Sequence, residues 1–586
     1  MPNSVGTRVP KPIPLPKRPL TVQPPIWAKS RQEVCESFEW FKSYQGGVYF
    51  KGDIARGYLL GGFYASRDLL ARDGRLIISH GGGKAESVHS KKGKPTLQEA
   101  SDQHEGDKSV RALLHTYRLR KEIALLIDDR YPLFPYDLSA KKDCTYVVLG
   151  FYHIVHAWAE RQPCNNEKGY VVRWKFAFEW CERQPAPWWL PPSGAVCPPD
   201  PDQPEQAAGP LEGRCPACKK KSPLVYKEGW MCLQPSCTAF WTFTDGVLGP
   251  EELTYDESFL AVSFRCEHDP LEDIVPQPPA VPEDGVVTSR RFSRGWHCKK
   301  CGRLSSRYKW QHWECNHCGE TMQVMGKNRI AKEFWGQNNS RFMTHKVHDP
   351  ANTIRMCSLM QGTVQSFNFP IKRSPGPRGT IYAVLGNSIV NRIADEIFDE
   401  YQEQAKTGEL QFRRFPLRSH HCRGELLTNY FSQNSGEPYQ YVGGTAHTVP
   451  FDAAPSAVVK ARDLIQSRMM SVMQAESQPY HFNEVLSAAY MEEQSMSFHS
   501  DAENGLGPRV ASLSLGSCAY MHFRLLKKYR TDGGSGNVPK SLTLFLRHGD
   551  VLIMDGADIQ KYYEHTVVPL NFRIAATARY IGRNHL

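Results

Sequence analysis

The chain has 586 residues, with 72 Lys and Arg against 61 Asp and Glu, 17 Cys, 42 Pro and a formal net charge of +11. This length exceeds what one hydrophobic core supports, so we expect several folded units. Hydrophobic residues make up 40% of the sequence and aromatic residues 11%, which excludes a mainly disordered chain. No apolar run approaches the roughly 18 residues of a membrane helix, so the sequence predicts no bilayer-spanning segment.

Residues 1–37 are basic and rich in proline, and we expect a disordered tail there, because such a stretch buries little apolar surface. They contain no apolar segment typical of a secretory signal peptide, so we expect a protein that is neither secreted nor membrane-bound. Their basic side chains are compatible with a weak nuclear-targeting signal or with an ordinary solvated tail, and we expect a nuclear location. Without export, cysteines serve more often as metal ligands and buried thiols than in disulfides.

Residues 38–190 predict a compact, strand-rich α+β domain, because short β-type runs alternate there with glycine and proline turns. One helix is expected near residues 110–119. The expected strands are residues 48–51, 76–79, 123–127, 146–156 and 171–180. The strand-rich order and the turns in GGFYASRD and ISHGGG give this domain a faint similarity to SRA-like and other PUA-like folds.

Two cysteine clusters lie in residues 191–265 and 266–350, each next to a proline-rich linker, of which the second is acidic. Two close cysteine pairs separated by 13 residues can supply four thiolates to one tetrahedral Zn(II) across a hairpin. Four cysteine ligands leave no open position, so we expect two structural zinc ribbons; chance clustering of free thiols is the alternative. The expected ligands are Cys215, Cys218, Cys232 and Cys237 for one ion and Cys298, Cys301, Cys315 and Cys318 for the other.

Nearly all of the net charge lies between residues 286 and 346, where 13 basic side chains stand against three acidic ones, giving about +10. Tryptophan and tyrosine residues are interleaved with these charges. This composition suits a phosphate backbone with stacking or cation–π contacts, so we expect a nucleic-acid-binding face, for DNA rather than RNA. An ordinary solvated face is the alternative. The expected contacts are Arg290, Arg291, Arg294, Lys299, Lys300, Arg303, Arg307 and Lys309.

The C-terminal region, residues 351–586, contains a histidine and carboxylate pattern typical of a metal site. His499-x-Asp501 comes just after a predicted strand, and His565 follows another strand about 66 residues after His499. Two histidines and one carboxylate form a facial triad that leaves positions open on Fe(II). Before this pattern we expect two helices, at residues 391–406 and 457–475, and a series of strands follows them.

Two arginines follow the pattern in FRIAATARYIG, a predicted strand of small and apolar residues. Arg573 and Arg579 are six residues apart, so their side chains share one face of the strand. Burying both is costly unless an anion pairs with them. A dicarboxylate such as 2-oxoglutarate would meet one arginine and chelate the iron. Pairing of the arginines with internal carboxylates stays open as the alternative.

These motifs resemble those of the AlkB-like Fe(II)/2-oxoglutarate-dependent dioxygenases over roughly residues 425–583. The resemblance includes His499-Ser500-Asp501, His565, Arg573 to Arg579, and the segments PYQYVGG, FNEVL, SLSLG and GDVLIM. The combination with other domains and a zinc ribbon is similar to multidomain, fungal AlkB-like proteins. The resemblance implies a C-terminal double-stranded β-helix (jelly-roll) core within a multidomain α+β chain.

The resemblance also implies roles for individual residues. His499, Asp501 and His565 would bind Fe(II). Arg573 would hold the distal carboxylate of 2-oxoglutarate together with Tyr490, and Arg579 would lie near the keto-acid end or the substrate. Glu503 matches the acidic position that contacts the flipped base. Tyr439 and Tyr441, together with Tyr430 and Phe431 in the stretch 424–448, could form an aromatic lid over that base or belong to the core.

Two positions depart from the family pattern. The asparagine between the two arginines is Ala575 here, and the asparagine two residues before Tyr490 is Ala488. Both asparagines normally help to hold the co-substrate, so its binding would be looser or would depend on other side chains. Neither change removes a metal ligand, and we expect an active enzyme.

The activity implied is oxidative demethylation of N-methylated bases in DNA, in which O2 and 2-oxoglutarate are consumed and the hydroxylated methyl group leaves as formaldehyde. N6-methyladenine is the first expectation for the substrate and N-alkyl damage the second. RNA demethylation, a nucleic-acid or chromatin reader with a degenerate dioxygenase scaffold, and protein hydroxylation are the alternatives. We expect no membrane partner, and a monomer is the default.

Overall fold

The computed structural model describes most of the chain, in segments separated by short gaps. The described residues are 16–65, 67–82, 85–88, 96–99, 101–164, 166–190, 211–261, 271, 273–324, 326–335, 345–348, 355–358, 365–371, 379–386, 388–417, 422–438, 447–473, 480–501, 505–529 and 538–582. Among them, no helix is long and apolar enough to cross a membrane.

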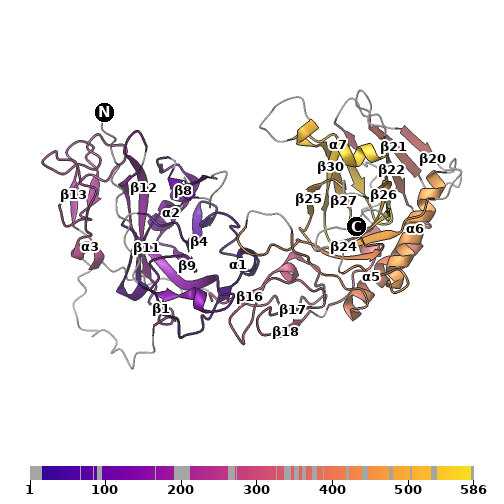
Figure 1. Ribbon diagram of the computed structural model, residues 1–586, viewed down its shortest axis with the longest axis horizontal. Coiled ribbons are helices and arrows are strands. Elements are labelled where there is room, and N and C mark those ends of the chain that lie inside the picture. The colour runs from indigo at the N-terminus through magenta and orange to yellow at the C-terminus, as the bar shows by residue number, and fades with distance from the viewer. Residues whose placement is uncertain are drawn as a thin grey trace. The chain divides into compact units, whose positions relative to one another are not determined.

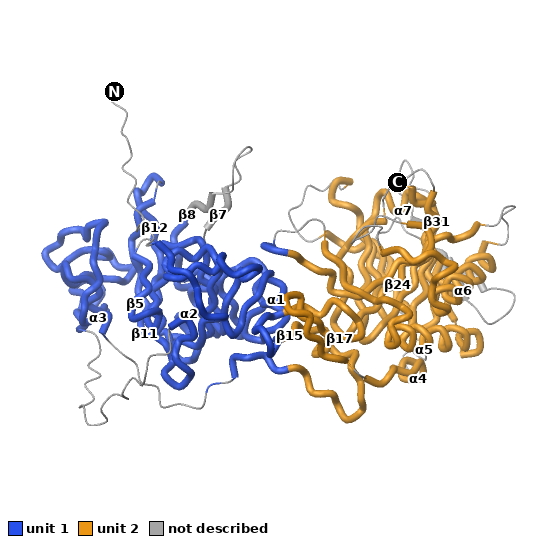
Figure 2. The backbone as a smooth tube through the Cα atoms, turned by 60° about the horizontal axis from the view of Figure 1, so that its bottom comes forward, with its two compact units in different colours: residues 1–277, 297–304, 421–424 blue, residues 278–296, 305–420, 425–586 orange. Residues whose placement is uncertain are grey.

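The chain forms two compact units, which Figure 2 colours blue and orange. Unit 1 comprises residues 1–277, 297–304 and 421–424, and unit 2 comprises residues 278–296, 305–420 and 425–586. Both are strand-rich with a few helices, as the sequence predicts for a mixed α+β chain.

Unit 1 is built on one eight-stranded sheet with the strand order β3-β4-β9-β11-β12-β6-β5, to which β2 is added beside β11. Its centre is the long antiparallel pair β11–β12, which is buried along most of its length. The strands are β2 (Trp27–Ala28), β3 (Val48–Lys51), β4 (Ile54–Leu60), β5 (Leu69–Ala71), β6 (Leu76–His80), β9 (Glu122–Asp128), β11 (Tyr146–Pro163) and β12 (Tyr170–Trp180). All five predicted strands are present, and the helix expected at 110–119 is α2 (Lys108–Leu119).

The prediction of a disordered tail over residues 1–37 is wrong for the part that the structure describes. From residue 16 onward this segment is folded: β1 (Arg18–Pro19) pairs with β10 (Tyr136–Asp137), and β2 and α1 (Arg31–Ser37) follow. The reason is a short apolar insert, because Ile26 and Trp27 are 2% and 1% exposed and anchor the chain on the sheet. Residues 1–15 lie outside the described part.

The first cysteine cluster belongs to unit 1 through a shared hydrophobic core. Tyr226, Trp241 and Phe259, from the segment around this cluster, are buried in the same core as Trp158 of β11. At the centre of this contact Glu160 of β11, which is fully buried, pairs with Arg67 at 3.1 Å. The remaining elements of this segment are β13 (Glu212–Arg214), β14 (Lys221–Pro223) and α3 (Glu257–Ala261).

Unit 2 is built on two main sheets. The larger one has the order β20-β21-β22-β29-β26-β31-β24-β23 and the smaller one β19-β28-β27-β30-β25. The larger sheet consists of β20 (Arg355–Ser358), β21 (Gln365–Ile371), β22 (Gly379–Leu385), β23 (Phe431–Gly436), β24 (Glu484–Tyr490), β26 (Leu506–Gly516), β29 (Val551–Asp555) and β31 (Arg573–Ile581). The smaller sheet consists of β19 (Lys346–Val347), β25 (Met496–His499), β27 (Ala519–Leu525), β28 (Leu542–Leu546) and β30 (Tyr563–Pro569).

From β24 onward the chain passes repeatedly between the two sheets, so consecutive strands lie on opposite sides of one interior, except β27 and β28, which pair within the smaller sheet. The two predicted helices are α5 (Arg392–Thr407) and α6 (Ser456–Val472), which pack on each other and on the larger sheet. Figure 1 shows them beside that sheet, while β25, β27 and β30 lie on the other side of the unit. The short elements are α4 (Lys332–Trp335), α7 (Ala557–Tyr562), β15 (Trp296–His297), β16 (Leu304–Ser305), β17 (His312–Glu314) and β18 (Thr321–Gln323).

The buried pair in unit 1 gives a test of its core. Replacing Glu160 with Ala should leave Arg67 as an uncompensated buried cation and destabilise unit 1 by about 3–5 kcal/mol. Native-state amide hydrogen exchange of β11 and β12 would measure this as faster exchange. Glu182→Ala removes the acid of the exposed Arg75–Glu182 pair and should leave these rates unchanged. Equal rates in the two variants would contradict the assignment.

Candidate active site and metal clusters

Three side chains from two neighbouring strands meet at one end of the interior between the sheets. His499 ends β25, Asp501 follows it by two residues, and His565 lies on β30 directly opposite His499. One ligand atom of each lies within 4.8 Å of the others, and the two imidazole centroids are 4.3 Å apart. Asp501 and His565 are 2% and 6% exposed, while His499 is half-buried, so the cluster is approached from the His499 side.

Hydrogen bonding and charge leave these groups in the state that a divalent metal requires. Nδ1 of His499 lies 2.9 Å from the carbonyl oxygen of Ser497; a carbonyl only accepts, so Nδ1 carries the proton and Nε2 is free to coordinate. Burial lowers the pKa of His565 to about 3, and His499 adds to this shift. Burial alone would raise the pKa of Asp501, but Arg579 and the two histidines bring it below its ordinary value. A neutral His565, a carboxylate at Asp501 and an available Nε2 on His499 fit an iron(II) site.

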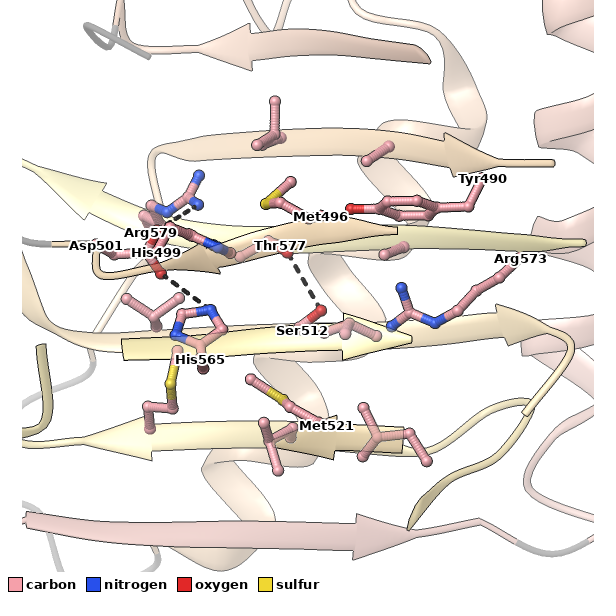
Figure 3. Close-up of a pocket in the computed structure, with 18 residues that line it drawn as sticks. Tyr490, Met496, His499, Asp501, Ser512, Met521, His565, Arg573, Thr577 and Arg579 are labelled. Atoms are coloured by element: carbon pink, nitrogen blue, oxygen red, sulfur yellow. Dashed lines mark hydrogen bonds and ion pairs between the residues drawn. The ribbon is translucent and has the colours of Figure 1, made fainter. Parts of the chain in front are cut away.

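The pocket behind this cluster is lined by alternate residues of the strands around it, which Figure 3 shows as sticks. The sequence prediction that Arg573 and Arg579 share one face of their strand is confirmed, because both line the pocket with Ala575 and Thr577 between them. Figure 3 places Arg579 beside the metal cluster and Arg573 at the far end, next to Tyr490. Most of the remaining lining is apolar, including three methionines.

Arg573 is a buried cation without a carboxylate partner among the described residues. It is 2% exposed, its Nη2 donates to Ser514 Oγ at 2.9 Å, and its Nε has no hydrogen-bond partner. The Tyr490 ring lies 5.8 Å from its guanidinium carbon, and burial lowers the pKa of Arg573 to about 10. A buried guanidinium with open donors at the end of a pocket fits a carboxylate ligand.

Arg579 differs, because the fold already supplies its anions. Its Nη1 lies 3.3 Å from Glu484 and its Nη2 lies 3.3 Å from Asp501. Glu484 is fully buried and stands directly opposite Arg579 in the β24–β31 pairing. Pairing with internal carboxylates, which the sequence left open for both arginines, therefore holds for Arg579, while no described carboxylate pairs with Arg573. Glu484 was missed because the sequence does not show which residue faces Arg579.

The two departures from the family pattern lie against each other. Ala488 of β24 is directly opposite Ala575 of β31, and both line the pocket. They form a small apolar cluster with Tyr430 and Tyr490, whose rings are 5.3 Å apart. One side of the pocket is therefore formed by two methyl groups and the Tyr490 ring, against which Tyr430 packs.

The residues predicted to contact the substrate fall into two groups, those outside the described residues and those that are buried. Glu503, Tyr439 and Tyr441 lie outside the described residues. Tyr430 and Phe431 are 4% and 0% exposed, so of the two interpretations of this aromatic stretch they fit the core rather than a lid.

The cysteines form the two predicted groups of four. In each, the sulfur atoms lie within 4.8 Å of one another, so either cluster could hold zinc. In the first, Cys215 and Cys237 are 3.8 Å apart, as are Cys218 and Cys232. The backbone N–H of Cys218 is the largest factor that lowers the pKa of Cys215, to about 7, which favours the thiolate that a metal binds.

Three of the four cysteine turns share one backbone conformation. In each of these turns, the residue directly after Cys-x-x-Cys donates its backbone N–H to the carbonyl of the first cysteine. These donor residues are Lys219, Gly302 and Gly319. These residues have φ values of 60°, 76° and 72°, in the left-handed region that favours glycine. Lys219 adopts it despite its side chain, which indicates that the four-cysteine arrangement defines the turn.

The predicted nucleic-acid-binding face is only partly at the surface. Arg290, Arg291, Lys299 and Lys300 are exposed, and Arg294 and Lys309 are half-buried. The prediction is wrong for Arg303 and Arg307, which are 2% and 1% exposed and cannot contact a phosphate in this conformation. Both serve the interior instead: Arg303 pairs with Glu33 at 2.8 Å, and Arg307 donates to backbone carbonyls, including that of Phe292.

Comparison with known proteins gives a family match for the region that contains the pocket. Residues 382–577 match the model of the 2OG-Fe(II) oxygenase superfamily, which covers about a third of the chain. This region is therefore a 2OG-Fe(II) oxygenase domain, in agreement with the resemblance of its motifs to AlkB-like members. The superfamily name implies Fe(II) and 2-oxoglutarate, with O2 as the oxidant. No curated protein matches the chain.

Several solved structures resemble parts of the chain at low identity. OsALKBH1 is 16% identical with a TM-score of 0.24, covering 34% of this chain and 96% of that one. The SUVH5 SRA domain in complex with fully methylated CG DNA is 18% identical with a TM-score of 0.17, covering 25% of this chain and 79% of that one. The modification-dependent TagI restriction endonuclease is 17% identical with a TM-score of 0.22, covering 29% and 52%.

Arg573 gives a test of the pocket's ligand. Arg573→Met should weaken 2-oxoglutarate binding at least about 30-fold, because a charged partner of a buried carboxylate is lost. Isothermal titration in the presence of Mn(II) would measure it, and the affinity for Mn(II) alone should not fall, because loss of a cation does not weaken binding of a dication. Arg524→Met, an outward arginine of the smaller sheet, is the control and should bind both ligands normally. Unchanged 2-oxoglutarate binding in the Arg573 variant would reject the assignment.

The first cysteine cluster gives a second test. Purified protein should contain two zinc ions per chain by elemental mass spectrometry, and Cys218→Ser should contain one. Because this cluster shares the core of unit 1, the same substitution should also speed amide exchange in β11. Cys164→Ser, outside both clusters, should retain both ions. Two zinc ions in the Cys218 variant would show that this cysteine is not a ligand.

Proposed function

We propose that the protein is an Fe(II)/2-oxoglutarate-dependent demethylase of N-methylated bases in DNA, with N6-methyladenine as first choice and N-alkyl damage as second. The observation that carries the proposal is a single pocket with a two-histidine, one-carboxylate cluster at one end and, at the other, a buried arginine that has no carboxylate partner within the described part of the chain. A dicarboxylic keto acid fits both ends at once. The repeated passage of the chain between two sheets supports a double-stranded β-helix core.

In this proposal His499, Asp501 and His565 hold Fe(II), which together with O2 and 2-oxoglutarate supplies the oxidising chemistry. The residues of the chain bind and orient the co-substrate. Arg573 binds its distal carboxylate beside Tyr490, and the apolar wall keeps water from its chain. The methylated base enters from the His499 side, because His499 is the most exposed of the three ligands.

Nucleic acid is proposed as substrate because the chain concentrates exposed cations in residues 286–346. Arg290 and Arg291 lie on a short turn, and Lys299 and Lys300 lie in the Cys298-x-x-Cys301 turn. Such side chains suit backbone phosphates, and base extrusion from a duplex would cost a few kcal/mol. The division into an N-terminal strand-rich domain, two ribbons and a dioxygenase domain is part of the proposal, as is a nuclear location.

The test is a demethylation assay on N6-methyladenine and alkylated oligonucleotides, as DNA and RNA and as single strands and duplexes. With Fe(II), 2-oxoglutarate and O2, methyl loss by mass spectrometry should be matched by formaldehyde release. His499→Ala should reduce turnover to background while retaining nucleic-acid affinity. No methyl loss from any substrate would reject the proposal, and preference for RNA would replace DNA in it.

A reader with a degenerate scaffold is the second candidate, and Ala488 facing Ala575 is the observation that favours it, because the family's co-substrate asparagines are absent there. This candidate predicts nucleic-acid binding without measurable affinity for 2-oxoglutarate. Titration of the metal-loaded protein separates the two.

A further inference from the structure

A buried glutamate stands behind the metal cluster without contributing a ligand to it. Glu484 begins β24, is fully buried, and contacts Arg579, which in turn contacts the predicted iron ligand Asp501. Both contacts of Arg579 are 3.3 Å long, and its two terminal nitrogens are divided between the two carboxylates. Arg579 is 3% exposed, so water screens neither contact effectively.

The charges of this site balance only when Glu484 is counted. The charged side chains that line the pocket, apart from the two histidines, are Asp501, Arg573 and Arg579, which sum to +1. Glu484 brings the sum to zero. A divalent metal and a dianionic keto acid together add no net charge, so the loaded site would be neutral as well. Neutrality before and after loading is favourable in a buried site, where uncompensated charge is costly.

Glu484 also determines where Arg579 directs its positive charge. Without a second anion, Arg579 would act on Asp501 alone and compete with the metal for that carboxylate. It would also be free to bind an incoming carboxylate, as Arg573 is. With Glu484 present, one half of the guanidinium is occupied, and Arg573 is left as the open anion receptor of the pocket.

We infer that Glu484 is a positioning residue that acts through Arg579: it preserves the affinity of Asp501 for the metal and restricts dicarboxylate binding to Arg573. This inference rests on the proposed iron and 2-oxoglutarate sites and assigns a role to a residue that contacts neither ligand. It predicts opposite effects on the two affinities, since removing one negative charge weakens binding of a dication and strengthens binding of a dianion.

The experiment compares Glu484→Gln with the wild-type full-length protein. Glutamine keeps the size and can still accept a hydrogen bond from Arg579, but removes the charge. The dissociation constant of Mn(II), followed by electron paramagnetic resonance without co-substrate, should rise about tenfold, as expected for losing part of a buried charge interaction. The dissociation constant of 2-oxoglutarate, titrated into protein saturated with Mn(II), should fall about three- to tenfold.

Three variants serve as controls. Glu564→Gln makes the same change in another glutamate–arginine pair, Arg524–Glu564 at 2.6 Å, one residue from His565 but on the outward face of β30, and should leave both affinities within about twofold. Glu484→Asp keeps the charge and should restore most of the Mn(II) affinity. The double variant Glu484→Gln with Arg579→Gln returns the site to its original net charge and should bind Mn(II) more tightly than Glu484→Gln alone.

The outcomes separate this inference from the proposed function. Opposite shifts in the two affinities support the role of Glu484. Weakening of both affinities would show that the glutamate only maintains the local fold. No change in either affinity would show that its charge does not affect binding at the site. Each of these results would overturn the inference. If Glu484→Gln does not fold, the Mn(II) affinity of Glu484→Asp and of the double variant decides. If the wild-type protein binds Mn(II) but not 2-oxoglutarate, the proposed function fails, while the Mn(II) titrations still test Glu484.

Discussion

The pairing of β24 with β31 is the constraint on which the rest of the pocket depends. Its register places Tyr490 opposite Arg573 at one end and Glu484 opposite Arg579 at the other. A shift by one residue would turn both arginines out of the pocket, because side chains alternate between the faces of a strand. Burial on both faces of the larger sheet holds the register, since the interior lies on one side and α6 covers the other.

This pairing gives two arginines of one strand different roles. Arg579 has its anions supplied by the fold, while Arg573 is held with open donors by Ser514 and the neighbouring Tyr490. Arg307 is also buried, but it donates to backbone carbonyls. A buried guanidinium with open donors, such as Arg573, costs several kcal/mol, so a protein selected for stability alone would not retain it. The rule that buried charges are paired is broken at sites where a bound ligand supplies the missing partner. The arginine is thus itself evidence for an anionic ligand, independent of any family resemblance.

How much the sequence predicts depends on whether the signal is local. Five of the eight strands in the central sheet of unit 1 and helices α2, α5 and α6 were predicted, because their apolar periodicity is contained in the segment itself; β2, β4 and β5 were not predicted, and β11 extends to Pro163, beyond its predicted end at residue 156. The pair His499 and Asp501 and the close cysteine pairs were also predicted, since close spacing within one turn brings ligands together. His565 is 66 residues after His499, and its prediction rested on the family pattern rather than on close spacing. Glu484 could not be predicted, because its role depends on a strand partner that lies 95 residues away.

The prediction of a disordered tail over residues 1–37 was wrong from residue 16 onward because it relied on average composition. The average composition of this segment is that of a tail, but its few apolar residues, among them Ile26 and Trp27, are buried in the core of unit 1. Composition averages over a window, whereas folding responds to the few side chains that can be buried.

The basic residues between positions 286 and 346 show the same difference between composition and the burial of individual side chains. Counted in sequence, 13 cations between residues 286 and 346 look like one surface, but the fold uses two of them internally. Arg303 directly follows the Cys298-x-x-Cys301 turn, and its carbonyl accepts the N–H of Cys298, so the turn fixes the backbone where its side chain begins. That side chain pairs with Glu33, whose own carboxylate accepts the backbone N–H of Ser30 at the start of α1. The cations at the surface of this window are therefore fewer than the sequence count, because the fold decides which of them are buried. Lys299 and Lys300, between the two cysteines of that same turn, are exposed.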